Sequence, residues 1–197
     1  LHNWLSHNMA IGSPQWMYAS GEAYTIDQSL KFNDDDSPYL TRTPASAGNR
    51  KTWTWSAWVK RSQSTTETPI FIVEEDGNNR VQFRFNSDQI RIYDVSSGSV
   101  AYDIKTTAVY RDYSAWLHIL VAFDTTQSTA SNRLKLYVNG TQVTDLATST
   151  YPSQNFDGVV NKAVAHNIGA ILSGSTNRYF EGYQTEVNFI DGQALTP

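Results

Sequence analysis

The stretch 116–143 constrains the fold of this chain more than any other. It contains two runs in which apolar side chains occupy every second position: Leu117, Ile119, Val121 and Phe123 in the first, and Leu134, Leu136 and Val138 in the second. A period of two is typical of β-strands with one buried face. The dipeptide Asn139-Gly140 follows directly and favours the type I′ turn of a hairpin, because both central residues of that turn need positive φ. The stretch therefore predicts three consecutive antiparallel strands in an all-β domain.

The same alternation recurs along most of the chain. We predict short strands at 29–32 and 39–41, a central strand at 53–60, four strands separated by turns at 69–75, 80–85, 89–95 and 99–104, and a last strand at 179–190. Residues 145–165 lack the alternation and are predicted to be irregular, and the apolar segment HNIGAIL follows them. Roughly twelve strands without a long helix indicate a two-sheet antiparallel β sandwich.

The central strand carries three tryptophans with different predicted environments. Trp53 and Trp55 share a face with Ala57 and are predicted core residues. Trp58 and Lys60 fall on the opposite face of the same strand. The pattern therefore predicts two tryptophans in the core and leaves Trp58 on the opposite face of the strand, either in a further packing contact or at a surface.

Length and composition limit the domain organisation and the function. A chain of 197 residues fits one domain. We assign 29–197 to the sandwich and 1–28 to an N-terminal arm or linker, which has helical spacing of apolar residues near its start. The chain begins with Leu1 and stops at LTP, so we expect a piece of a longer protein.

Composition also excludes several classes of partner. The net charge is −4 and the Lys and Arg residues are scattered, so we expect no nucleic-acid partner. No apolar run approaches the ~20 residues that a membrane helix needs, so we expect no membrane insertion. The absence of cysteine excludes disulfides and thiol chemistry.

Three segments carry a resemblance to a known family. They are the strand and turn Tyr137-Val138-Asn139-Gly140, the terminal turn 191–195, and the closing segment with Phe180, Gly182, Glu186 and Val187. From residue 29 to its end, the chain resembles the laminin-G-like jelly rolls of the concanavalin A-like lectin and glucanase superfamily. The resemblance implies a jelly-roll sandwich in which the first strand, 29–32, pairs with the last strand.

Two further segments resemble a particular group of proteins with this fold. SLKFNDDDSPYLTRTP and FIDGQALTP are similar to modules of structural and fibre proteins of tailed phages, notably phages of aquatic bacteria. This similarity implies a virion or extracellular location, a homo-oligomer (trimer or larger), and contacts with other virion proteins or cell-surface glycan. We expect a non-catalytic binding or structural module of a virion appendage. The alternatives are a carbohydrate-binding module of a secreted bacterial protein and a virion domain that contacts only protein.

Catalysis is not expected. Glucanases of this superfamily use Glu-x-Asp-x-x-Glu on a strand, where alternation brings the carboxylates to one face. In this chain Glu74 and Glu75 are adjacent, and Glu181 and Glu186 are an odd number of residues apart, so each pair faces opposite sides of a regular strand. The chain also lacks a Gly-x-Ser-x-Gly elbow and a phosphate loop.

Candidate ligand-binding residues lie on predicted turns and strand surfaces. A sugar site needs an exposed aromatic ring and amide or carboxylate groups that bond hydroxyls. The candidates with these side chains are Asp76, Asn78, Asn79, Tyr93 and Tyr137. Trp58, Tyr102 and Tyr179 are further aromatic candidates, and each aromatic residue is also a candidate for packing in a core or an interface.

Calcium is the one cofactor that the sequence leaves open. Asp34 and Asp36 lie in an acidic turn, and calcium binds several oxygen ligands on such loops. The resemblance permits a calcium ion on a loop at the rim of the sandwich, for which these two residues are the candidate ligands. The alternative is that the acids form Asx turns at strand ends.

Overall fold

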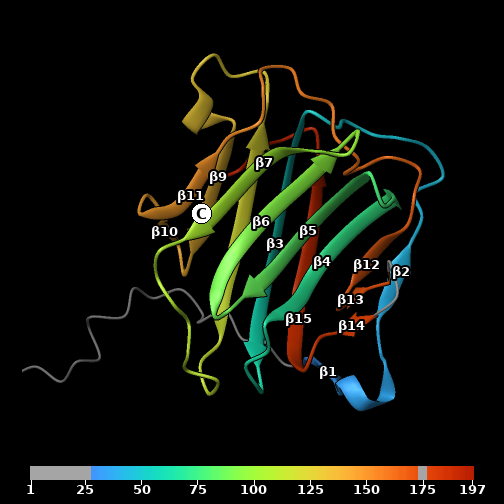
Figure 1. Cartoon of the computed structure of the whole chain (residues 1–197), viewed down its shortest axis with the longest axis vertical. Helices are drawn as coiled ribbons and strands as arrows, with labels where there is room; N and C mark the ends of the chain where they lie inside the picture. Colours follow the sequence, from blue (N-terminus) through green and yellow to red (C-terminus); the bar gives the residue numbers. More distant parts are fainter. Residues whose placement is uncertain (1–27, 173–176) are drawn as a thin grey trace, which may run out of the picture.

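The computed structural model describes residues 28–172 and 177–197, which form a sandwich of two large antiparallel sheets and a small third one (Figure 1). Sheet A has the order β1 (Leu30–Phe32), β15 (Gly182–Asp191), β3 (Thr52–Arg61), β8 (Leu117–Asp124), β9 (Leu134–Val138), β10 (Thr141–Gln142). Sheet B has the order β11 (Leu146–Thr150), β7 (Ser99–Thr106), β6 (Gln89–Ser96), β5 (Asn79–Asn86), β4 (Glu67–Asp76), β12 (His166–Ile168), β2 (Leu40–Arg42). The small sheet pairs β13 (Ala170–Ile171) with β14 (Arg178–Tyr179). The predicted all-β two-sheet class is confirmed.

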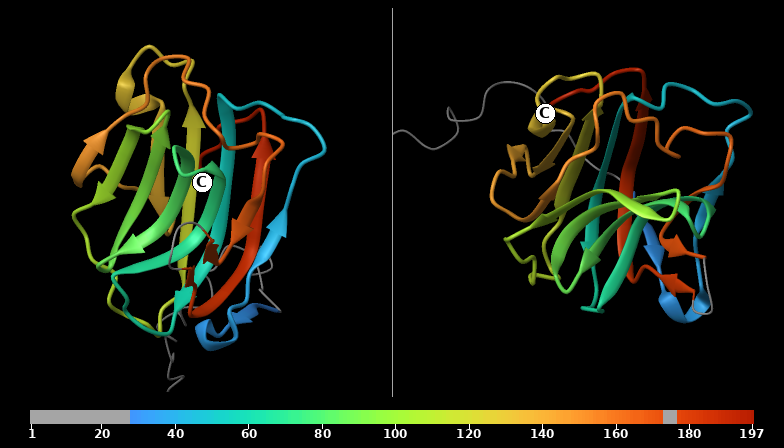
Figure 2. Two further views of the ribbon diagram at one scale, coloured as in Figure 1. Left: turned by 45° about the vertical axis from the view of Figure 1, so that its right-hand side comes forward. Right: turned by 45° about the horizontal axis from the view of Figure 1, so that its top comes forward.

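The two large sheets form the two layers of the sandwich. Figure 2 shows the green strands of sheet B crossing one side of sheet A, whose strands are coloured teal, yellow and red. Strands β4 to β7 follow one another in sheet B, as the four alternating runs predicted. The pairing of the first strand with the last is also confirmed, with Leu30 opposite Gln184 and Phe32 opposite Gly182.

The predicted hairpin lies in sheet A. Strands β8, β9 and β10 are consecutive neighbours, and β9 turns into β10 through Asn139 with φ 50° and Gly140 with φ 80°. Two positive φ values in succession are the geometry of a type I′ turn. The stretch 116–143 therefore folds as its pattern predicts.

Aromatic side chains fill the space between the sheets. Trp53 and Trp55 on β3 are fully buried, as predicted. The Trp53 ring stacks on Phe123 of β8 at 4.5 Å between centroids, and the Trp55 ring meets Phe83 of β5 edge-on at 5.3 Å. The second contact joins the two sheets, because β3 belongs to sheet A and β5 to sheet B.

The sequence missed one strand and merged others. The polar segment 145–165 contains β11, an edge strand that pairs with β7 and carries too few apolar residues to show alternation. The segment HNIGAIL is divided into β12 and β13 by Gly169, whose φ is +82°. The predicted last strand is likewise divided into β14 and β15, because the chain breaks its pairing at Phe180 and Glu181.

Helix is scarce in the described residues. Within 28–172 and 177–197 it is limited to two short 3-10 turns, η2 (Asp34–Asp36) and η3 (Ala130–Asn132). No helix in this part of the chain is both long enough and apolar enough to cross a membrane. The predicted N-terminal helical turn lies outside the described residues.

Candidate functional site

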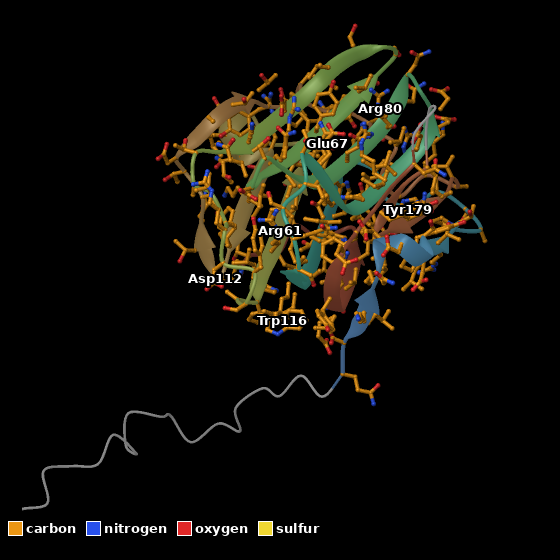
Figure 3. The ribbon with its side chains drawn as sticks, turned by 60° about the horizontal axis from the view of Figure 1, so that its bottom comes forward. Arg61, Glu67, Arg80, Asp112, Trp116 and Tyr179 are labelled. Carbon is orange, nitrogen blue, oxygen red and sulfur yellow. The ribbon has the colours of Figure 1, made fainter. Side chains whose placement is uncertain are left out.

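The outer surface of sheet A carries a group of aromatic side chains near one end of the sandwich. On β3, β8 and β15, the side chains of Trp58, His118 and Tyr183 alternate with side chains that point toward sheet B, so these three point away from it. Trp116 immediately precedes β8, and its ring lies beside that of Tyr183. We call the half-buried outward side chains Trp58, Trp116, His118 and Tyr183 the aromatic face. In Figure 3, Trp116 lies at one end of the molecule, close to Asp112 and away from Arg80.

Strand register brings these four side chains together. Trp58 on β3 is paired with His118 on β8, and their ring centroids lie 5.1 Å apart. Tyr183 on β15 is paired with Lys60 of β3, and its ring lies 6.4 Å from that of Trp116. The aromatic face thus consists of two pairs of rings, Trp58 with His118 and Trp116 with Tyr183. The two pairs are offset by two residues along the strands, which corresponds to about 6.6 Å.

Polar groups border the aromatic face. The Lys60 ammonium nitrogen lies 5.9 Å from the centroid of the Tyr183 ring, within cation–π range. The Thr185 hydroxyl, opposite Trp58, donates to the carbonyl oxygen of Gln28 at 2.7 Å. The surface therefore combines flat apolar rings with a cation and a hydroxyl.

His118 is a neutral ring at pH 7. Partial burial lowers the pKa of its imidazole below the usual 6.5. Its backbone is fixed by Asn139, whose side-chain oxygen accepts from the His118 N–H at 2.8 Å and whose N–H donates to the His118 carbonyl at 2.8 Å. The hairpin turn therefore holds one edge of the aromatic face in place.

The predicted site residues of the β4–β5 turn are engaged with one another. Asp76 accepts from the Asn78 N–H at 2.8 Å and from the Asn79 side-chain nitrogen at 3.0 Å. The Asn79 side-chain oxygen accepts from the N–H of Ser97 in the β6–β7 turn at 3.0 Å. These bonds brace two neighbouring turns of sheet B.

Tyr93 lies on the outer surface of sheet B, on the opposite side of the molecule from the aromatic face. The guanidinium carbon of Arg91 lies 4.5 Å from its ring centroid and that of Arg84 lies 5.6 Å away. Both arginines are ion-paired, Arg91 with Asp103 at 2.7 Å and Arg84 with Glu67 at 2.7 Å. The Tyr93 ring is therefore already stacked against protein cations.

Tyr137 is on the outer surface of sheet A but is only 7% exposed. It packs with Leu120 and Ala122 in a small cluster apart from the main core. Tyr102, another aromatic candidate, is buried between the sheets. Neither ring has a free face for a sugar.

The acidic turn with Asp34 and Asp36 borders an open polar hollow that also includes Gln63 and Glu181. Asp34 accepts from the Gln63 side chain at 2.9 Å, its N–H donates to Glu181 at 2.7 Å, and Asp36 accepts from Asn33 at 2.7 Å. In the described part of the chain, no group of three or more His, Asp or Glu side chains is arranged to hold a metal ion. Calcium binding at Asp34 and Asp36 stays a prediction.

The predicted site residues thus lie in separate parts of the structure, and among them Trp58 belongs to the aromatic face. Alternation predicted that Trp58 faces outward. Trp116 and Tyr183 could not be found, because they join Trp58 only through the pairing of β3 with β8 and β15, which the sequence does not state.

A family model matches most of the chain. Residues 34–197 match the family model described as the concanavalin A-like lectin/glucanases superfamily. The chain belongs to this superfamily. No curated protein sequence matches the chain.

Solved structures of this superfamily's fold resemble the chain at low sequence identity. Domain 4 of the extracellular arabinanase AbnA from Geobacillus stearothermophilus, in complex with arabinotriose, has a TM-score of 0.54 and 21% identity over 75% of this chain and 64% of that chain. Domains LG4-5 of the mouse laminin alpha1 chain have a TM-score of 0.59 and 8% identity over 89% of this chain and 45% of that chain. The CBM40 domain of a Ruminococcus gnavus sialidase, bound to sialyllactose, has a TM-score of 0.51 and 12% identity over 80% of this chain and 93% of that chain. These likenesses confirm the fold, and the chain spans less than two thirds of the first two structures.

Proposed function

We propose that this chain is a non-catalytic glycan-binding module and that glycan binds on the aromatic face. The observation that carries the proposal is the convergence of Trp58, Trp116, His118 and Tyr183 on one outward surface. A contiguous apolar patch on a protein surface often marks a site for a ligand or a partner. Two similar sandwiches, in the arabinanase and the sialidase, are complexed with oligosaccharides, which supports the same ligand class here.

The chemistry of the aromatic face suits a sugar. A sugar ring presents apolar C–H groups on its faces and hydroxyls around its rim, so it needs a flat apolar surface bordered by a few polar groups. The indoles of Trp58 and Trp116 supply the flat surface. The Lys60 ammonium and the Thr185 hydroxyl are placed to bond sugar oxygens at its border.

The acidic pairs considered for hydrolysis lend no support to catalysis. Glu181 accepts the N–H of Asp34 at 2.7 Å. Glu186 has φ 50° and lies in the irregular part of β15 between Thr185 and Asn188, where it is exposed. Glu74 and Asp76 lie at the end of β4, where Asp76 bonds the adjacent turn. A non-catalytic module is therefore the simplest proposal.

The larger assembly is part of the same proposal. We infer from the segments 29–44 and 189–197 that the module belongs to a virion appendage of a tailed phage, where it works as a trimer or larger homo-oligomer among other virion proteins. Repeated copies of a weak glycan site would then act together by avidity. A carbohydrate-binding module of a secreted bacterial protein is the alternative, and native mass spectrometry of the full chain separates the two, because that alternative expects a monomer.

A glycan array with the full chain tests the ligand class. We expect wild type to bind a defined set of oligosaccharides and Trp58→Ala to lose at least about tenfold in affinity, the effect of truncating an interface anchor. Trp58→Phe should retain part of the affinity because it keeps a ring. Tyr93→Ala, on the opposite sheet, is the control and should bind as wild type. Loss of binding in Tyr93→Ala but not in Trp58→Ala would refute the assignment to the aromatic face.

A further inference from the structure

A cleft on the other sheet has the features of a second ligand site. It lies on the outer surface of sheet B where β2, β12 and β4 are adjacent, and in Figure 1 β2 and β12 are at one edge of the sandwich. We call it the edge cleft and define it by Tyr39, Thr41, Glu74, Asp76, Asn167 and Leu172, which line it. None of these residues belongs to the aromatic face.

Asn167 is an unusual residue for the surface of a sheet. Register places it between Thr41 of β2 and Ile72 of β4, and its side chain is only 5% exposed. Its side-chain carbonyl oxygen has no hydrogen-bond partner among the described residues. Buried polar atoms are nearly always paired, because water cannot replace a missing partner. An unpaired buried acceptor in the lining of a cleft points to a ligand that brings a donor.

The charged groups that line the edge cleft are also acceptors. Glu74 and Asp76 contribute carboxylates, and the N–H of Asn78 lowers the pKa of Asp76, so that this group is ionised at neutral pH. Glu75, which also lines the cleft, is paired with Lys162, and the charge of Lys162 contributes to the lowered pKa of Asp76. Three carboxylates beside this one cation leave the lining with an excess of negative charge. A ligand that fits must therefore offer several hydrogen-bond donors and no negative charge.

The walls of the edge cleft are apolar. Tyr39 is 42% exposed and presents its ring, and Leu172 lies on the lining as well. A sugar ring has C–H groups on its faces and hydroxyl donors on its rim, so it fits a cleft that combines apolar side chains with hydrogen-bond acceptors. We propose that the edge cleft is a second binding site, which takes one uncharged pyranose residue and rejects sugars that carry a carboxylate. This inference rests on the proposed function for its ligand class, but on different residues.

The test is a titration of the ¹⁵N-labelled full chain with uncharged methyl pyranosides and with glucuronate, followed by NMR. We expect the side-chain amide signal of Asn167 to shift with an uncharged sugar and not with glucuronate. Tyr39→Ala and Asn167→Ala should each weaken this binding at least tenfold. Leu40→Ala, the matched control at the position next to Tyr39, should bind as wild type, and Tyr39→Ala keeps the test valid if Asn167→Ala fails to fold.

The NMR results distinguish failure of the edge cleft from failure of the aromatic face. Shifts at Asn167 that persist in Trp58→Ala support a site independent of the aromatic face, even if the aromatic face itself binds no glycan. Absence of shifts at Asn167 with every uncharged pyranoside would overturn the edge cleft while leaving the aromatic face in place. Equal binding of glucuronate would also overturn it, since two carboxylates should repel that sugar.

Discussion

Replacing Asp94 by asparagine should remove a pH dependence of stability that the wild-type chain shows between pH 8 and pH 5. Asp94 lies on β6 opposite Tyr102 and is 1% exposed. One of its carboxylate oxygens has no hydrogen-bond partner among the described residues. Burial raises the pKa of Asp94 from 3.8 to about 7, although a hydrogen bond from Tyr102 and the charge of Arg80 partly oppose this rise.

The sign follows from the two pKa values. The folded chain holds the Asp94 proton more tightly than the unfolded chain, so the free energy of unfolding gains a contribution below pH 4 that is lost as pH rises through about 7. At 1.36 kcal/mol per pKa unit, the full contribution is about 4 kcal/mol. Between pH 8 and pH 5 it amounts to about 3 kcal/mol, with the greater stability at pH 5.

Urea unfolding followed by tryptophan fluorescence measures this contribution. The free energy of unfolding should be determined at pH 8 and pH 5 for wild type, Asp94→Asn and Asp112→Asn. Asp112 is exposed, so its replacement should keep the wild-type difference. Subtracting the Asp94→Asn values from those of wild type isolates the contribution of Asp94. If that difference is the same at both pH values, Asp94 ionises normally and the reasoning from its burial is refuted.

Two further predictions concern single positions in the fold. Gly182 has φ 140°, and a Cβ at this position would lie 2.1 Å from the Lys60 carbonyl oxygen. Gly182→Ala should therefore lower the free energy of unfolding by about 3 kcal/mol or more. Gly140 has φ 80° and open space around it, so the control Gly140→Ala should lower it by about 1 kcal/mol. Equal urea midpoints for these two variants would contradict the role of the close approach between β15 and β3. The Arg61 side chain is 3% exposed and pairs with Asp88 at 3.1 Å, so Arg61→Met should lower the unfolding free energy by about 3 kcal/mol. A loss below about 1 kcal/mol would show that the other donors to Asp88 replace the arginine.

The parts of the fold that were predictable are those with a strong period of two. Strands such as β3, β8 and β9 alternate buried and outward side chains along their length, so their faces follow from the sequence alone. Strand β11 was missed because an edge strand buries little on either face. The division of the last strand at Phe180 and Glu181 was missed because a local loss of strand pairing leaves no mark on hydrophobic patterning.

The candidate site was harder to predict for a related reason. Alternation assigned Trp58 to the outer face, but it does not say which strands flank β3. Tyr183 lies more than 120 residues away along the chain and joins Trp58 only because β15 pairs with β3. Alternation also does not show whether an outward strand residue is covered, and Tyr137 is only 7% exposed. Side-chain type and period are local properties, whereas a binding surface depends on strand order.

The most direct test of glycan binding on the aromatic face is an NMR titration of the indole N–H signals with the best oligosaccharide from the array. Trp58 and Trp116 lie on the aromatic face, and the indole nitrogens of Trp53 and Trp55 are buried between the sheets, so one spectrum contains both the test and its control. We predict that the indole signals of Trp58 and Trp116 shift in proportion to occupancy while those of Trp53 and Trp55 stay unchanged. Unchanged Trp58 and Trp116 signals at saturating ligand would contradict binding at this surface.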